Sequence, residues 1–287
     1  MSWLVHLRLG RVSNLPTVWT NVVAGAILAG AAFDLGTLLA LLVALSLFYV
    51  GGMYLNDAFD RTIDARERPE RPIPSGLISA RAVFALGFGM LGAGIAMLAV
   101  AAMRGPSVWG AVAAGVVLAA AITYYDAVHK RDPLSPLVMG LCRVLVYFAA
   151  ALAVAGALPA TVLLGAAALL AYLIGLTYVA KQENLSEFRN AWPLLFLAAP
   201  FVSALPTLVD SLAGAVLYLL FLGWVAYSLS FLMRSRISIP GAVSRLIAGI
   251  SLLDALLVMG VGAPRMAAGA AVAVVLTRVF QRYVAGT

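Results

Sequence analysis

The sequence predicts an all-α polytopic membrane protein with nine, or at most ten, transmembrane helices. Hydrophobic residues make up 63% of the 287 residues, and the mean hydropathy is +1.02. Charged residues make up only 11%, whereas a soluble domain carries roughly 25%. Apolar runs of about 20 residues, enough to span a bilayer, recur along the chain. Because a backbone in lipid must satisfy its own hydrogen bonds, these runs are expected to be helices.

Ten segments are apolar enough to be spans. They cover residues 16–33, 36–55, 82–103, 107–125, 136–156, 160–180, 192–209, 212–232, 241–262 and 265–284. The ninth contains Arg245 and Asp254, so it is expected to be amphipathic or broken, which leaves the count at nine or ten. No linker divides the chain, so residues 1–287 are expected to form one transmembrane domain with polar loops at 56–80, 125–135 and 181–191.

Basic residues gather on one side of the predicted bundle. The N-terminus and the connections after the second, fourth, sixth and eighth spans hold Arg8, Arg11, Arg61, Arg66, Arg68, Arg71, Lys130, Arg131, Lys181, Arg189, Arg234 and Arg236. The other connections hold little beyond Asp34, Arg104 and Asp210. The positive-inside rule therefore predicts a multi-pass protein of the plasma (inner) membrane with its N-terminus and polar loops in the cytoplasm.

The ends, the cysteine count and the net charge exclude several classes of protein. The first residues lack the charged, apolar and small-residue regions of a cleavable signal peptide. The one cysteine, Cys142, excludes intrachain disulfides and thiolate metal clusters. The net charge of +7 is explained by the cytoplasmic loops, and no basic, aromatic-interleaved segment points to nucleic acid. No obligate protein partner is indicated.

The acidic residues are more informative, because topology does not require them on the basic side. Nine of the 12 Asp and Glu residues lie in three loops at 56–71, 126–132 and 183–187. Acids clustered at one mouth of a helical bundle indicate a polar site there. The wide separation of the first and third loops also suggests two four-helix halves.

The first acidic loop carries three aspartates with helical spacing. Asp57, Asp60 and Asp64 stand at i, i+3 and i+7, and Asn56 lies four residues before Asp60. If the second span continues into the loop, these side chains share one face and repel each other unless a cation is bound. Oxygen ligands without His or Cys favour a hard ion such as Mg²⁺, which usually shares a phosphate-bearing substrate.

The segment "RPERPIPSG" then ends the helix. Its prolines stop helix propagation, which holds Arg68 and Arg71 in a stiff loop beside the carboxylates. Guanidinium forks match the oxygens of a diphosphate. The loop therefore predicts a Mg²⁺–diphosphate site at the membrane surface; a solvated loop of compensating charges is the alternative.

The run from Asn56 to Gly76 resembles the first aspartate-rich motif of the UbiA superfamily of intramembrane prenyltransferases. The resemblance implies eight or nine helices around a lipid-accessible cavity that the polar loops cap. It also implies that Asn56, Asp57, Asp60 and Asp64 hold Mg²⁺ and the diphosphate, with Arg68 and Arg71 as cationic support. The sequence of the loop further resembles that of divergent bacterial UbiA-like proteins encoded in Ebo-type gene clusters. This resemblance suggests a non-aromatic, cyclitol-like acceptor.

The second loop, "TYYDAVHKRDPLSP", matches the place where the family carries a tyrosine and a lysine that bind the diphosphate and help it leave. Tyr125 and Lys130 are the best matches, one residue further apart than the usual spacing, so Tyr124 or Asp126 can share this role. Lys130 as a plain interfacial anchor is the alternative. His129 is expected to be a polar interface residue rather than a base.

The third loop departs from the family pattern. It has no aspartate, only Glu183 and Glu187, which are four residues apart and so share a helical face. They either hold a second Mg²⁺ or belong to a rebuilt site in which Lys181 and Gln182 contact the acceptor. Lys181 is also a candidate for binding the diphosphate.

Polar residues within the spans are functional candidates because burying them in lipid is costly. They are Asn14, Asn21, Arg143 and Asp254. The segment around Asn14 resembles the first helix of the family, in which an asparagine faces the cavity, so Asn14 is expected to contact the diphosphate.

Together these patterns predict Mg²⁺-dependent transfer of a prenyl group from an allylic polyprenyl diphosphate to a small acceptor at the cytoplasmic face. One alternative is phosphoribosyl transfer to a polyprenyl phosphate. Another is a transport or lipid-binding protein without catalysis. Transporters tend to place ionisable groups near mid-membrane, whereas most acids here lie at the mouth, which favours the enzyme.

Overall fold

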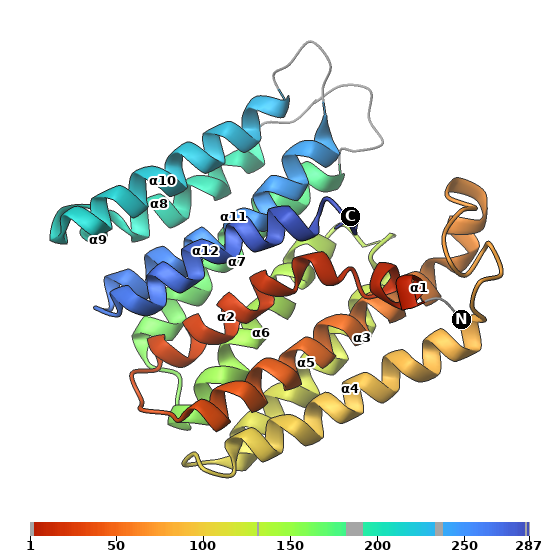
Figure 1. Cartoon of the computed structure of the whole chain (residues 1–287), viewed down its shortest axis with the longest axis horizontal. Helices are drawn as coiled ribbons and strands as arrows, with labels where there is room; N and C mark the ends of the chain where they lie inside the picture. Colours follow the sequence, from red (N-terminus) through yellow and green to blue (C-terminus); the bar gives the residue numbers. More distant parts are fainter. Residues whose placement is uncertain (1–2, 131, 182–191, 233–237, 285, 287) are drawn as a thin grey trace.

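A computed structural model describes residues 3–130, 132–181, 192–232, 238–284 and 286. Within these residues the regular structure is helical, as predicted, and the helices lie side by side in one bundle (Figure 1). Within these described ranges, seven helices are long and apolar enough to cross a membrane. They are α3 (Leu35–Glu67), α4 (Ala80–Ala102), α5 (Val108–Val128), α6 (Ser135–Ala155), α7 (Ala160–Lys181), α10 (Leu212–Leu229), which continues into η3 (Ser230–Leu232), and α11 (Ile239–Gly260).

The remaining apolar segments form shorter helices. A short α1 (Trp3–Leu9) and a turn, η1 (Val12–Asn14), precede α2 (Leu15–Leu28), and α12 (Pro264–Phe280) ends the bundle. The expected seventh span is instead divided into η2 (Trp192–Ala198), α8 (Ala199–Ser203) and α9 (Leu205–Asp210). Pro200 and Pro206 explain this division, because proline has no N–H to donate and clashes with the preceding turn.

Of the two alternatives for the ninth span, an amphipathic or a broken helix, the broken helix is wrong. Helix α11 is continuous from Ile239 to Gly260 and is the most buried of the long helices. Its two charged residues find partners inside the protein. Arg245 lies over the ring of Phe231 at 3.8 Å, and Asp254 accepts hydrogen bonds from α2 and α6. An ionisable residue therefore does not interrupt a buried helix when neighbouring helices satisfy it.

Side chains at the helix starts explain the boundaries. Asp34, Ser79, Ser107 and Ser211 each accept a hydrogen bond from the backbone N–H three residues later, at the starts of α3, α4, α5 and α10. These caps satisfy N–H groups that have no partner within the helix. Helix α3 ends at Glu67, immediately before the proline-containing segment, as the sequence predicts.

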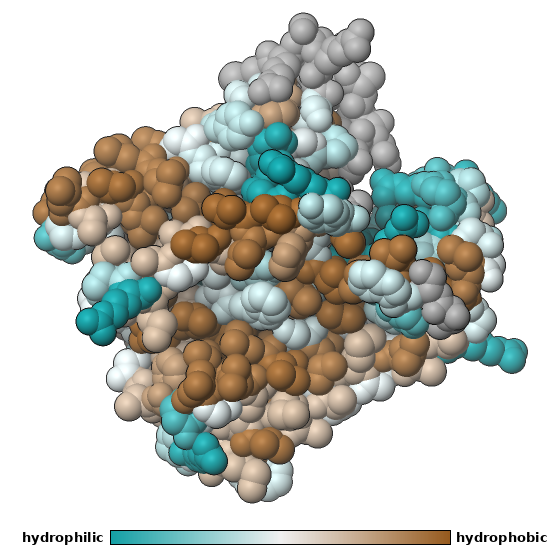
Figure 2. All heavy atoms as spheres, viewed as in Figure 1, coloured by the Kyte–Doolittle hydropathy of each residue, from teal (hydrophilic) through white to brown (hydrophobic). Residues whose placement is uncertain are grey.

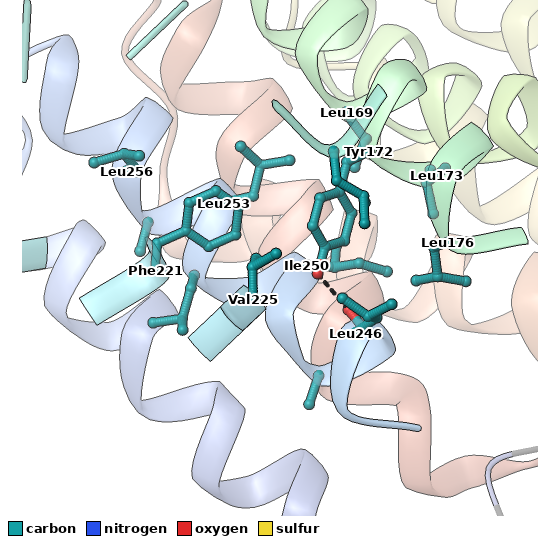
Figure 3. Close-up of a cluster of buried hydrophobic side chains, with 14 of the residues drawn as sticks. Leu169, Tyr172, Leu173, Leu176, Phe221, Val225, Leu246, Ile250, Leu253 and Leu256 are labelled. Atoms are coloured by element: carbon teal, nitrogen blue, oxygen red, sulfur yellow. Dashed lines mark hydrogen bonds between the residues drawn. The ribbon is translucent and has the colours of Figure 1, made fainter. Parts of the chain in front are cut away.

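Two large hydrophobic clusters form the core, and α2 and α6 contribute to both. One cluster contains residues of α2, α6, α7, α10, α11 and α12. The other contains residues of α2, α3, α4, α5 and α6. Figure 3 shows part of the first, where Tyr172 of α7 packs against Phe221 and donates a hydrogen bond to the carbonyl of Leu246. Because α2 and α6 belong to both clusters, the clusters do not divide the bundle into separate halves, and the two four-helix halves suggested by the loop spacing stay a prediction.

The connections separate into two opposite ends, as the charge pattern predicts. At one end the guanidinium of Arg104, from the α4–α5 connection, pairs with Asp34 at 2.7 Å. At the other end the residues after α5 meet the end of α3, where Lys130 lies near Asp60, and the end of α7, where Lys181 contacts Asp132. Figure 2 shows hydrophobic residues over most of one face and hydrophilic residues gathered near α1 and the loop after α3, with smaller hydrophilic patches at the opposite end. We call the end with α1 and the loop after α3 the polar end.

The crossing of α2 and α6 depends on Gly25. A Cβ atom at this position would lie 2.7 Å from the Cα and carbonyl oxygen of Tyr147, which are backbone atoms that cannot move aside. We therefore expect Gly25→Ala to destabilise the protein by about 1–3 kcal/mol through overpacking. Thermal unfolding in detergent measures this. The matched control is Gly89→Ala in α4, where a Cβ meets nothing within 4 Å, and an equal effect of both changes would contradict the prediction.

Candidate functional site

The last three turns of α3 carry the predicted carboxylates on one buried face. Asn56, Asp57, Asp60 and Asp64 are each no more than 7% exposed. All four lie within the continuous helix Leu35–Glu67, so the prediction that they share a face is confirmed. Buried carboxylates need compensating charge or hydrogen bonds, and the structure shows what supplies them.

Arg11 and Arg71 both contact this face, and both reach the same oxygen, Oδ1 of Asp57. Arg71, in the turn after α3, contacts Asp64 at 2.8 Å and Asp57 at 3.3 Å. Arg11, from the segment between α1 and η1, contacts Asp57 at 3.1 Å and the side-chain oxygen of Asn56 at 3.2 Å. The prediction that Arg71 supports the carboxylates is consistent with this placement. Arg68 also lines the cavity described below.

Arg11 is a site residue that the sequence reasoning missed, because it was counted only among the cytoplasmic charges. Its backbone has φ 41°, the one positive φ at a residue other than glycine among the described residues. Such a conformation is costly for an L-residue and concentrates at functional sites. Burial lowers the pKa of its guanidinium, but the Asp57 carboxylate, with Tyr49 and Asp126, raises it by more, so the net pKa lies above its ordinary value.

The end of α5 supplies the second group of predicted residues. Asp126 is 3% exposed, and its Oδ1 accepts a hydrogen bond from Asn56 at 3.1 Å. Tyr125 lines the same cavity and stacks on His129 with ring centroids 4.9 Å apart. Tyr124 is exposed, and its hydroxyl contacts Asp132 instead. The structure therefore places Tyr125, and not Tyr124, beside the carboxylates.

Asp60 contacts two cationic or ionisable groups from the same helix end. Its Oδ2 lies 3.4 Å from Nε2 of His129 and 3.7 Å from Nζ of Lys130. Lys130 is half exposed and points to the carboxylate face, which is the position expected of a diphosphate-binding lysine. His129, expected to be an interface residue, is thus part of the site.

Of the residues predicted in the third loop, the structure describes only Lys181. Lys181 donates a hydrogen bond to the carbonyl of Asp132 at 3.2 Å and is not among the residues that line the cavity. Glu183 and Glu187 lie outside the described residues, as does Gln182, so their roles stay predictions. The ammonium of Lys181 is already bound to the carbonyl of Asp132. Lys181 is therefore a weaker candidate for binding the diphosphate than Arg11.

Asn14 lines the cavity, as predicted, but its amide also contacts the end of the chain. Its Nδ2 donates to the carbonyl of Gly286 at 2.8 Å, and its Oδ1 accepts from Gln281 at 3.0 Å. The predicted contact between Asn14 and a diphosphate would therefore compete with these bonds.

A cavity of about 350 Å³ begins at these side chains and continues between the helices. Its mouth is lined by Arg11, Asp60, Arg71 and Lys130, and its walls include Phe48, Leu118, Ile122 and Ile250. Its size lies within the usual range of small-molecule sites, about 300–1,000 Å³. One end of the cavity is charged and the other is mainly apolar, so it suits a molecule with a charged head and a hydrocarbon tail.

The carboxylates fit a hard metal ion bound together with a substrate. No three His, Cys, Asp or Glu side chains in the described ranges are grouped closely enough to hold a metal ion by themselves. Mg²⁺ commonly takes only one or two protein carboxylates and completes its shell with water and phosphate oxygens. The Oδ2 atom of Asp126 is buried without a hydrogen-bond partner among the described groups, so the cluster has an acceptor oxygen still to be satisfied.

The polar residues within the spans form a connected chain of hydrogen bonds. Arg143 donates to Asn21, and Asn21 donates to Asp254. Of these three, only Arg143 lines the cavity. They come from α6, α2 and α11, so they are brought together by packing and not by local sequence.

Comparison with known proteins identifies the fold and the family. The model of the UbiA prenyltransferase family matches residues 17–238, which is most of the chain. The chain belongs to the UbiA prenyltransferase family. The resemblance noted at the first aspartate-rich loop is thus confirmed, as is the all-helical membrane fold, while the count of nine or ten spans stays a prediction.

Curated relatives of the UbiA family match part of the chain. A digeranylgeranylglyceryl phosphate synthase from Methanopyrus kandleri is 44% identical over 93 residues, which cover 32% of this chain and 34% of the relative. One of the same name from Ignicoccus hospitalis is 35% identical over 123 residues, covering 42% and 37%. The matched segments thus span about a third of the length of these relatives.

Solved structures of the UbiA family match nearly the whole chain in fold. A digeranylgeranylglyceryl phosphate synthase structure gives a TM-score of 0.58 at 16% identity, covering 94% of this chain and 98% of that one. A UbiA homologue from Archaeoglobus fulgidus bound to GPP and Mg²⁺ gives a TM-score of 0.52 at 16% identity, covering 96% and 99%. At this identity the likeness establishes the shared fold.

Proposed function

We propose that the protein transfers a prenyl group from an allylic polyprenyl diphosphate to a small acceptor, with Mg²⁺ as cofactor. The observation that carries the proposal is the cavity, in which buried carboxylates and guanidinium groups form the mouth and apolar side chains form the walls. Membership of a prenyltransferase family supports it. A related structure bound to GPP and Mg²⁺ supports the choice of substrate and ion.

Each group at the mouth has a role in this reaction. Asp57, Asp60 and Asp64, with Asp126, would hold Mg²⁺, which neutralises charge on the diphosphate. Arg11, Arg71 and Lys130 bind the diphosphate oxygens, and Tyr125 donates a hydrogen bond to them. As the allylic C–O bond breaks, the electron pair leaves with the diphosphate, and fixed cations stabilise the charge that develops there.

The apolar part of the cavity binds the prenyl tail and excludes water. Phe48, Leu118 and Ile122 lie on α3 and α5 between the mouth and the interior. An allylic cation formed among these side chains is protected from water, so it reacts with the nucleophile of the acceptor, which then loses a proton. Water exclusion of this kind is what a membrane-embedded cavity can provide.

The names of the curated relatives favour a phosphate-bearing acceptor. They are digeranylgeranylglyceryl phosphate synthases, so we propose a prenylated glyceryl phosphate as the first acceptor to try. These names also favour prenyl transfer over phosphoribosyl transfer.

Diphosphate release tests the proposal. Purified protein in lipid nanodiscs is given radiolabelled geranyl, farnesyl or geranylgeranyl diphosphate, with a prenylated glyceryl phosphate, a cyclitol or an aromatic acid as acceptor. We expect release that requires both an acceptor and Mg²⁺ and stops when EDTA is added. The absence of release with every pair would overturn the proposal, and binding of the diphosphate without release would favour a lipid-binding protein.

We also propose that the polar end lies in the cytoplasm and that the protein resides in the plasma membrane, because arginine and lysine concentrate at this end. In a Cys142→Ala background, Ser75→Cys lies at the polar end and Ala32→Cys at the opposite end, and both positions are exposed. An impermeant maleimide added to intact spheroplasts is expected to label Cys at position 32 and to spare position 75. The reverse pattern would show the opposite orientation.

A further inference from the structure

We propose that Arg143 binds an anionic oxygen group, a phosphate or a carboxylate, of the acceptor in the deep part of the cavity. The proposal rests on the prenyl-transfer function and deepens it, because it assigns a separate cationic site to the second substrate. It concerns a residue on α6, away from the aspartates and arginines of the mouth.

The first step of the argument is the charge state of the surroundings. Arg143 lines the cavity, and its direct hydrogen-bond partners are neutral: its Nη1 donates to Asn21 at 3.0 Å and its Nη2 to Thr17 at 3.1 Å, while the carboxyl group of Asp254 lies behind Asn21. Its guanidinium also lies 5.4 Å from the ring centroid of Tyr49. No described Asp or Glu oxygen lies within 4 Å of it in an ion pair, in contrast to Arg11 and Arg71.

Burying a charged arginine at this depth costs free energy unless an anionic or polar group offsets the charge. Charged side chains inside the membrane are rare, and those that face a cavity usually mark a substrate path. A guanidinium has five N–H donors, and two hydrogen bonds leave donors for a ligand. The fork geometry suits two oxygens of a phosphate or carboxylate.

The second step is the chain of hydrogen bonds that orients this arginine. Asp254 is fully buried; its Oδ2 accepts from Nδ2 of Asn21 at 2.8 Å, and its Oδ1 accepts from the hydroxyl of Tyr147. Because the amide nitrogen of Asn21 is bound to Asp254, its oxygen must face Arg143. Asp254 is therefore a positioning residue that orients the guanidinium through Asn21.

The third step is the distance from the diphosphate site. Tyr49 lies eight residues before Asp57 on α3, and a rise of 1.5 Å per residue places the two Cα atoms about 12 Å apart along the helix. The Tyr49 hydroxyl reaches back to the carbonyl oxygen of Arg11 at 3.3 Å, so the guanidinium of Arg143 beside this ring lies on the inner side of the diphosphate site. An acceptor whose anion is held at Arg143 would present its nucleophile between the two cationic sites, where the allylic carbon lies.

The alternative is that the network only stabilises the contact between α2, α6 and α11. Stability alone cannot separate the two roles, because breaking a buried network is costly in either case. Substrate selectivity separates them. A purely structural arginine affects an anionic and a neutral acceptor equally, whereas a binding arginine distinguishes them.

The test compares acceptors that differ only in charge. A geranylgeranylglyceryl phosphate is compared with the same lipid lacking the phosphate, and 4-hydroxybenzoate with phenol, in kcat/KM for diphosphate release. We expect wild type to prefer the anionic member of at least one pair. We expect Arg143→Gln to reduce that preference about tenfold or more, since a charge-assisted hydrogen bond is lost. The KM for the prenyl diphosphate should stay unchanged, and Arg143→Lys should keep part of the preference.

Binding supplies a readout that does not depend on turnover. The anionic lipid should raise the Tm of wild type more than the neutral lipid does, and Arg143→Gln should lose this difference. If wild type shows the difference but releases no diphosphate, the proposed function fails while this inference holds. An unchanged preference in Arg143→Gln, or in Arg143→Lys should the glutamine variant not fold, overturns the inference. Equal stabilisation of wild type by all charged and neutral probes overturns it as well.

Discussion

Asp60→Asn is expected to reduce diphosphate release by at least about a hundredfold, the scale on which loss of one charge-stabilising group acts. Asp60 is 5% exposed, lines the cavity and contacts both His129 and Lys130. Asparagine keeps the size of the side chain but removes the charge that a metal ion needs. The loss should therefore appear without a large change in stability.

The measurement is the rate of release at saturating prenyl diphosphate over a range of Mg²⁺ concentrations. We expect the variant to need more Mg²⁺ for half of its residual rate. The matched control is Glu70→Gln, which removes a carboxylate from the same loop at an exposed position that does not line the cavity. A wild-type rate of Asp60→Asn at limiting Mg²⁺ would exclude Asp60 as a metal ligand.

Arg11→Gln is expected to have the second large effect, a fall of about a hundredfold in kcat/KM for the prenyl diphosphate. Arg11 joins the segment before α2 to Asn56 and Asp57 on α3, so it both contacts the diphosphate site and holds its shape. The kcat/KM of Arg11→Lys should lie between those of wild type and Arg11→Gln, because an ammonium keeps the charge but cannot form the same fork of hydrogen bonds.

Arg8→Gln is the matched control for this charge. Arg8 is exposed on α1, only three residues away, and does not line the cavity. We expect its variant to keep wild-type kinetics, whereas equal losses in both variants would point to a general charge effect. If Arg11→Gln lowers the Tm but the folded fraction keeps full activity, the role of Arg11 is structural only.

The aspartate face and the helix pattern could be predicted from the sequence because both are local. Asp57, Asp60 and Asp64 share a face as a direct result of a helical period and of prolines placed just after the helix. The spans follow from apolar length in the same way. The alternative of a broken α11 was wrong, because the partners of Asp254 lie on α2 and α6 and no local pattern reveals them.

Arg11 shows why part of the site could not be predicted. In sequence it is one of several basic residues at the N-terminus, and its charge has an adequate explanation in topology. Only the left-handed backbone at this position and the packing of α1 beside α3 bring its guanidinium to Asp57. The choice between Tyr125 and Tyr124 also needed the structure, because it depends on which side of α5 faces the bundle: Tyr125 lines the cavity and Tyr124 is exposed.

The sequence by itself determined the membrane class, the helical architecture, the two-sided distribution of charge and the carboxylates of the first loop. These depend on hydropathy, helical period and proline chemistry, which act over a few residues. The tertiary structure decided which cations meet those carboxylates, that Arg143 faces the cavity and that Asp254 orients it through Asn21. Such contacts join helices far apart in the chain, and they exist only once close packing has set the distances between them.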